Sequence, residues 1–153
     1  MRYVALGLSL LFAACDSGPV SEAEAQGVHI SPNRNGDLVF SRAALPTIHT
    51  AFVNGPSRTV YLYDAFPGAI TLERREGDEW VGHPLPYGTV AVVPGPLPLD
   101  PGEYQPLWDL PLFELNDVGP GTYRVKASVF EDAAFERPLP EPQRVSPAFQ
   151  VTE

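Results

Sequence analysis

Apolar and polar residues alternate with a period of two in several short segments of the chain. Successive side chains of a β-strand point to opposite faces of a sheet, so this pattern predicts strands with one buried face. The clearest example is residues 122–130, and residues 148–152 repeat the pattern near the end of the sequence. The side chains expected in the core from these two segments are Tyr123, Val125, Ala127, Val129, Phe149 and Val151.

Two segments nearer the middle of the sequence also predict strands. Residues 48–53 are apolar on both faces, which is typical of a central strand. A turn at residues 54–57 separates this segment from residues 58–63, where Val60 and Leu62 are expected to be buried.

Residues 69–81 predict a β-hairpin with Gly77 in a left-handed conformation. A three-residue loop with a glycine bulge would set Leu72 opposite Trp80, and we favour this register because it buries the tryptophan. A two-residue loop would instead set Arg75 opposite Trp80.

Proline and glycine interrupt the chain too often for a helical protein, with 18 prolines and 13 glycines. Residues 84–111 carry eight prolines in 28 residues and must be edge strand or loop, because proline cannot donate to a ladder. Residues 89–93 are the only convincing strand there. In the whole chain the pattern allows at most a short helical turn, near residues 131–136. This spacing of strands and turns predicts an all-β sandwich of two sheets, with about seven to eight strands.

Several motifs resemble those of a known family. The segment 119–125 is similar to a "P-G-x-Y-R-V" strand, residues 70–80 to an "L-E-…-G-x-W" hairpin, and residues 99–103 to an "L-x-P-G-E" turn. Together they resemble bacterial immunoglobulin-like domains that occur in lipoproteins and are related to the intracellular proteinase inhibitor family. The resemblance implies an immunoglobulin-like sandwich with a tyrosine corner, in which the hydroxyl of Tyr123 binds backbone near Asp117.

The start of the chain predicts a secretory leader. Residues 4–14 are eleven uncharged, mostly apolar residues, too few for a transmembrane helix but suited to a signal peptide. The sequence Leu-Phe-Ala-Ala-Cys that ends at Cys15 resembles the lipobox of bacterial lipoproteins. This resemblance implies cleavage before Cys15 and lipidation of its thiol; an ordinary secretory leader with an incidental cysteine is the alternative.

The expected organisation is a signal peptide at residues 1–14, a lipidated cysteine with a flexible tether at residues 15–26, and one domain at residues 27–153. The protein would then be held by its lipid at the cell membrane or the outer membrane, outside the cytoplasm. The net charge of −9 repels phosphate groups, so nucleic acid is excluded as a partner and a basic membrane-binding patch is not expected.

The sequence contains no recognisable catalytic or metal-binding motif. His29, His49 and His83 fall in separate segments without the short spacing of a zinc site. Met1 and Cys15 are the only methionine and cysteine, which excludes a blue-copper site within the domain. We therefore expect a protein that is not an enzyme and carries no metal or cofactor.

The aromatic residues are the best candidates for a binding surface. Such side chains bind sugars or protein partners when they are exposed, and the candidates are Tyr61, Tyr63, Tyr104 and Trp108. Alternatively, these rings cover the second face of a sheet beneath neighbouring loops.

The function expected from these observations is a lipid-anchored, non-catalytic binding or structural module of the bacterial cell envelope, with an unknown protein or glycan partner. A second hypothesis is a proteinase inhibitor that acts through the proline-rich loop at residues 94–108; a loop lying flat on a sheet would argue against it. A third is a carbohydrate-binding or enzymatic domain, which would need a concave site lined by aromatic residues and acids.

Overall fold

A computed structural model describes residues 26–44, 46–64, 69–83, 85, 95–107, 109–112 and 118–153 of the chain. These residues form strands, turns and two short 3-10 helices, and they include no α-helix. No helix in the described part is long and apolar enough to span a membrane. Cys15, Trp108 and the expected strand at residues 89–93 lie outside the described residues.

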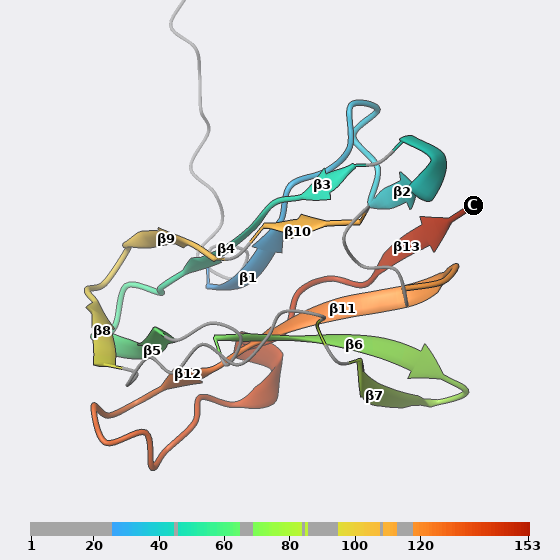
Figure 1. Cartoon of the computed structure of the whole chain (residues 1–153). Coiled ribbons are helices and arrows are strands. Elements are labelled where there is room, and N and C mark those ends of the chain that lie inside the picture. Colours follow the sequence, from blue (N-terminus) through green and yellow to red (C-terminus); the bar gives the residue numbers. More distant parts are fainter. Residues whose placement is uncertain are drawn as a thin grey trace, which may run out of the picture.

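The strands of the described residues form four sheets (Figure 1). One sheet has the order β1 (Gly27–Ile30), β4 (Thr50–Val53), β9 (Tyr104–Pro106), and a two-stranded sheet pairs β10 (Leu110–Pro111) with β3 (Thr47–Ile48). The largest has the order β2 (Val39–Ser41), β13 (Phe149–Thr152), β11 (Gly121–Ala127), β6 (Ile70–Glu76), β7 (Glu79–His83). The fourth has the order β12 (Val129–Phe130), β5 (Val60–Asp64), β8 (Gly95–Leu99), and the 3-10 helices are η1 (Arg42–Ala44) and η2 (Glu141–Gln143).

The core lies between two layers of strands. In Figure 1, β1, β4, β9, β3 and β10 lie above β6, β11, β5 and β12. Val28 and Phe52 from the upper layer join Leu72, Tyr123 and Val125 from the lower layer in one buried cluster. The predicted all-β class is therefore confirmed, and the buried positions expected in β5, β11, β12 and β13 are the observed ones.

The segment 122–130 keeps its predicted alternation of burial but divides between two sheets. β11 ends at Ala127, and β12 begins at Val129 and pairs with β5 instead of β6. Ser128 joins the two: its N–H donates to the carbonyl of Ala69 at 2.9 Å, and its carbonyl accepts from the N–H of Tyr63 at 2.9 Å. The alternation of side chains therefore predicts which residues are buried. It does not predict that the partner strand changes from β6 to β5 at Ser128.

The predicted register of the hairpin is wrong. β6 and β7 are joined by a two-residue turn, Arg75 faces Trp80, and Leu72 faces His83. Gly77 has φ +62° as predicted, and Asp78 beside it has no positive φ, which fits a tight turn with glycine at its first central position. Trp80 therefore lies on the outer face, where the guanidinium carbon of Arg124 stands 4.6 Å from its ring centre.

The proline-rich stretch forms edge strands, as expected. β8 and β9 are each the last strand of their sheets, and β10 belongs to a pair. The sequence predicts only one strand in this stretch, at residues 89–93. That number is wrong, because the described part of the stretch contains β8, β9 and β10. Residues 131–136, where the sequence allows at most a short helical turn, are a loop of turns in which Asp132 binds the backbone, and the two 3-10 helices lie elsewhere, at η1 and η2.

Tyr123 has the predicted tyrosine-corner hydrogen bond. Its ring is fully buried, and its hydroxyl donates to the carbonyl of Gly119 at 2.7 Å. Burial raises the pKa of the Tyr123 hydroxyl, while the charges of Arg74 and Arg42 oppose that rise. Gly119 lies just downstream of the expected partner, Asp117, which is outside the described residues.

Candidate binding surface

The outward face of the sheet β12-β5-β8 carries the two tyrosines singled out from the sequence. On β5, Val60 and Leu62 point inward and are buried, so Tyr61 and Tyr63 point outward. Both tyrosines are partly exposed. The alternation of one strand thus brings two aromatic rings to the same face.

Aromatic and proline residues occupy the neighbouring positions of that face. Tyr61 is flanked by Pro98 on β8 and by Phe130 on β12, and Phe130 is bridged in turn to Pro138. Tyr63 is paired with Pro96 on β8. A row of four such residues therefore crosses the sheet, with a second row beside it.

Phe135 completes this surface from a strained backbone position. It has φ +60°, the only positive φ of a non-glycine residue in the described part of the chain. Its ring centre lies 5.1 Å from that of Tyr63 and 5.1 Å from that of Phe130, both in edge-on geometry. Such backbone strain persists only where the surroundings enforce it, and it clusters at functional positions.

Asp132 holds the loop that carries Phe135. One carboxylate oxygen accepts from the N–H groups of Ala134 and Glu136, and the other accepts from the N–H and the guanidinium of Arg137. Desolvation is the largest single influence on the Asp132 carboxyl and acts to raise its pKa. The hydrogen bonds from Glu136, Arg137 and Ala134 together outweigh it and set the pKa below the usual value. Phe135 is therefore held over the sheet by an ionised carboxylate.

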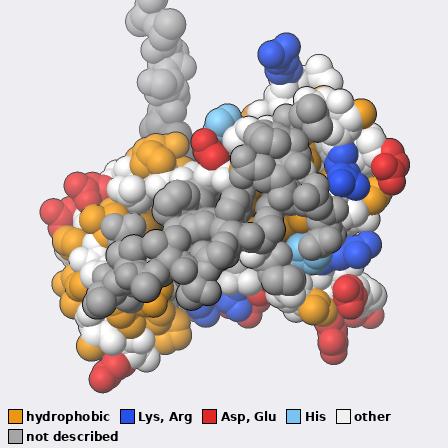
Figure 2. Space-filling view, viewed as in Figure 1, with side chains coloured by type: hydrophobic (Ala, Val, Ile, Leu, Met, Phe, Trp, Pro, Cys, Tyr) orange, Lys and Arg blue, Asp and Glu red, His pale blue; other side chains and the backbone are white. Residues whose placement is uncertain are grey.

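We call this surface the aromatic–proline face, and its members are Tyr61, Tyr63, Pro96, Pro98, Phe130, Phe135 and Pro138. The three prolines are exposed and the four rings are partly exposed. Figure 2 shows hydrophobic side chains gathered at the lower left of the molecule, where Figure 1 places β5, β8 and β12. A contiguous apolar area with a polar boundary is typical of an interaction site.

Charged residues beside the aromatic–proline face are paired with one another. Arg58 contacts Glu131 at 2.8 Å, and Arg137 contacts both Asp132 at 3.1 Å and Glu131 at 3.8 Å. Glu131 directly follows Phe130 in the chain, so these pairs adjoin the aromatic row. The boundary of the face is therefore polar, and the charges of these four residues balance.

Among the described strands β8 is the last of its sheet, and its outer edge lacks hydrogen-bond donors at alternate positions. The N–H of Tyr63 points toward β12, so the pair Tyr63–Pro96 is not hydrogen-bonded between β5 and β8. The nitrogen atoms of Pro96 and Pro98 accordingly face away from β5, where neither can donate. An added strand would find no N–H at these positions, so the surface is open to contact on its face rather than at its edge.

The structure brings together two of the four predicted surface residues. Tyr61 and Tyr63 lie on the aromatic–proline face, whereas Tyr104, 64 % exposed, lies on β9 in a different sheet. Trp108 lies outside the described residues. Phe135 contacts the ring of Tyr63, and both tyrosines remain partly exposed.

Sequence reasoning missed the other five members of the face. The sequence Gly-Pro-Leu-Pro-Leu of β8 does contain a signal, because proline alternates with leucine at the period of a strand. Phe130 could have been placed outward from the alternation of residues 122–130. Nothing local indicates that Phe135 and Pro138 return to the same sheet.

The segment proposed for protease inhibition lies along sheet edges. Its residues 95–99 pair with β5 throughout, and residues 104–106 pair with β4. Leu99 is buried, and a turn at residues 100–103 connects the two strands. The described part of the segment is therefore bound to the sheets and does not project as a loop.

The three histidines do not form a ligand set: the segment of His49 runs beside that of His29, whereas His83 lies in another sheet. His29 lies on β1 and His83 on β7, and Nδ1 of His49 contacts Oδ1 of Asp109 at 2.9 Å. The described residues contain no cluster of three or more histidine, cysteine or acidic side chains that could hold a metal ion.

Comparison with known proteins gives no match: no family model fits the sequence, and no curated protein and no solved structure is significantly similar to it.

Proposed function

We propose that the chain is a lipid-anchored, non-catalytic module of the bacterial cell envelope, built as an immunoglobulin-like sandwich, that binds another envelope protein through its aromatic–proline face. The leader and the lipobox-like sequence ending at Cys15 support the anchor. The all-β architecture and the hydrogen bond between Tyr123 and Gly119 support the immunoglobulin-like fold.

The observation that carries the binding function is the composition of one sheet face. Its centre contains only aromatic and proline side chains, and its boundary contains paired charges. Protein interfaces have this arrangement, with aromatic residues enriched and charged residues depleted at the centre. Aromatic residues at such centres often contribute most of the binding energy.

The charges favour a partner other than a second copy of the chain. A net charge of −9 on each molecule opposes self-association and opposes binding of nucleic acid. The arginines beside the face are already paired, so they offer no free cation to an acidic ligand. A partner with an apolar surface fits this boundary best.

The proposal is tested with the purified chain as immobilised bait for an extract of the native envelope. We expect one protein to be retained, and to be lost with Tyr61→Ala combined with Tyr63→Ala. The single change Tyr104→Ala is the matched control, because that exposed tyrosine lies on another sheet. Removing two interface aromatics should weaken binding by roughly tenfold or more.

Thermal unfolding of each variant separates lost binding from lost folding. A double variant that unfolds at the normal temperature and still retains the protein would contradict the proposal. Retention of the chain by purified envelope polysaccharide, with the same dependence on Tyr61 and Tyr63, would assign the face to a glycan and also overturn it.

A further inference from the structure

A concave region lies away from the aromatic–proline face, at the end of the molecule where β2, β3 and β13 meet (Figure 1). It is a hollow of about 1010 Å³, lined by the loop after β1, by β2 and η1, by residues 46–49 and by the end of β13. Clefts of this size accommodate small organic ligands. Its walls come from one stretch of the sequence, residues 31–49, and from Thr152 near the end of β13.

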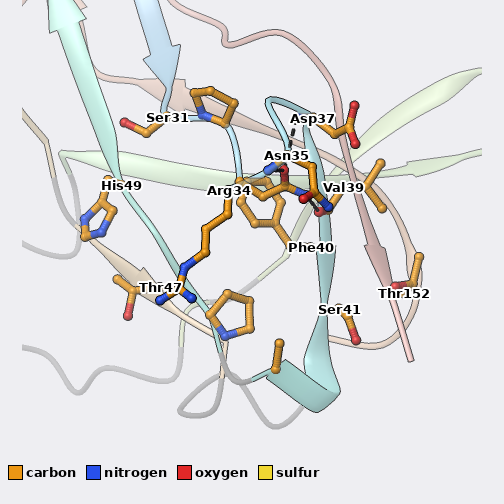
Figure 3. Close-up of a pocket in the computed structure, with 14 residues that line it drawn as sticks. Ser31, Arg34, Asn35, Asp37, Val39, Phe40, Ser41, Thr47, His49 and Thr152 are labelled. Atoms are coloured by element: carbon orange, nitrogen blue, oxygen red, sulfur yellow. Dashed lines mark hydrogen bonds between the residues drawn. The ribbon is translucent and has the colours of Figure 1, made fainter.

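Arg34 supplies an unpaired positive charge to this hollow. Figure 3 shows its side chain extending from the loop across the hollow toward Thr47. Among the described residues, Arg34 has no hydrogen-bond or ion-pair partner. The imidazole of His49, also in the lining, is bound to Asp109 instead. A single free guanidinium therefore faces the space.

The loop that presents Arg34 is fixed in advance by Asn33. The side-chain oxygen of Asn33 accepts from the N–H of Asn35 at 2.8 Å and of Asp37 at 3.1 Å, and its amide donates to the carbonyl of Val39 at 2.7 Å. These bonds tie both ends of the loop to the start of β2. A ligand would thus meet a loop whose backbone needs little further ordering.

The rest of the lining is both polar and apolar. Hydroxyl groups come from Ser31, Thr47 and Thr152, and the exposed side chains of Pro32 and Val39 supply carbon surface. In Figure 3, Asp37 lies on the side of the hollow opposite to the guanidinium, where its carboxylate can accept a hydrogen bond. This lining suits a ligand with many hydroxyl groups and some exposed C–H surface.

From these features we infer that the hollow binds a sugar acid, with its carboxylate on Arg34 and its hydroxyl groups on the polar lining. The planar guanidinium matches a planar carboxylate through two parallel hydrogen bonds. The guanidinium balances the single charge of a carboxylate bound beside it, whereas a phosphate dianion would be left undercompensated in a hollow that also contains the Asp37 carboxylate, on a chain of net charge −9. The site is independent of the proposed protein-binding face.

The test is a titration of the purified full chain with sodium D-glucuronate, followed by amide chemical shifts. Saturable shifts are expected around Thr47 and Phe40. D-Glucose, the neutral counterpart, should bind at least about tenfold more weakly, because hydrogen bonds to a charged group contribute more than neutral ones.

Two arginine variants locate the carboxylate. Arg34→Gln should weaken glucuronate binding at least about tenfold, whereas Arg75→Gln makes the same charge change on the distant hairpin and should leave it unaltered. Both side chains are exposed, so folding should be preserved. Equal affinity for glucose and glucuronate, unchanged affinity in Arg34→Gln, or the absence of saturable glucuronate binding would each overturn the inference.

Discussion

At the scale of single residues, Phe135 shows how a local strain can support a surface. A left-handed backbone destabilises a residue that has a Cβ atom by roughly 1–2 kcal/mol. The edge-on contacts of its ring with Tyr63 and Phe130 and the four hydrogen bonds to Asp132 offset this. The conformation therefore depends on the surroundings and not on the local preference of phenylalanine.

Two substitutions of Phe135 separate its backbone from its ring. Phe135→Gly and Phe135→Ala both remove the ring, but only glycine adopts φ +60° freely. We expect the glycine variant to be more stable than the alanine variant by about 1 kcal/mol in urea unfolding. An alanine variant that is as stable as the glycine variant would show that the backbone is not strained. Both variants should bind the envelope partner more weakly.

The hydrogen bond of Tyr123 gives a second residue-scale prediction. Tyr123→Phe removes the hydroxyl and leaves the carbonyl of Gly119 without that donor, while the ring stays packed against Phe149. The free energy of unfolding should fall by about 0.5–1.5 kcal/mol. Tyr104→Phe, which alters an exposed hydroxyl, is the control and should have no effect. Equal stability of the two variants would mean that the corner bond contributes nothing.

At the scale of elements, the hairpin β6–β7 shows the limit of local patterns. Both candidate loops use Gly77 with positive φ, so the glycine alone cannot select the register. The preference for a buried tryptophan selected the wrong register, because Trp80 contacts another side chain on the outer face of the sheet. That partner, Arg124, lies on β11 and also binds Glu73 at 2.6 Å.

The observed register has a measurable consequence. Trp80→Ala should lower the free energy of unfolding by only about 1–2 kcal/mol, mainly through loss of the cation–π contact with Arg124. Leu72→Ala, which empties a buried position on the neighbouring strand, should lower it by about 2–5 kcal/mol. Chemical denaturation of the two variants checks the order, and a larger effect at Trp80 would contradict the observed register.

Strands with a clear alternation of apolar and polar residues were predictable from the sequence, but the strands with which they pair were not. The inward residues of β5, β11 and β13 follow from the period of two alone. The change of sheet at Ser128 does not, since it depends on hydrogen bonds to Ala69 and Tyr63. The same holds for the candidate surface. The outward positions of Tyr61 and Tyr63 are predictable from the alternation along β5, whereas the contact of Phe135 with Tyr63 depends on how a distant loop folds.

At the scale of the whole molecule, two surfaces of different chemistry are held at opposite ends of one fold. Figure 1 places the aromatic–proline face around β5, β8 and β12 and the hollow around β2, β3 and the C-terminal end of β13. The first has paired charges around apolar rings, and the second has a free guanidinium among hydroxyl groups. Binding at one should therefore leave the other accessible.

The proposed anchor is tested on the whole protein in its cell. Cys15→Ser removes the thiol that would carry the lipid, so acyl labelling should disappear and the protein should move from the membrane fraction to the soluble fraction. An unchanged share of the variant in the membrane fraction would rule out anchoring through Cys15. Tyr104→Ala serves as the control, because it leaves the cysteine in place.

The parallel pairing of β2 with β13 bears on the order in which the chain folds. It joins residues 39–41 to residues 150–152, and Phe40 contacts Phe149 with ring centres 5.8 Å apart. During synthesis β2 leaves the ribosome well before its partner strand, which lies about 110 residues further along the chain. Pairings between such distant segments form slowly, because a long loop must close before any contact is gained. The five-stranded sheet therefore closes after translation of the domain, and until then the nascent chain stays open at this edge.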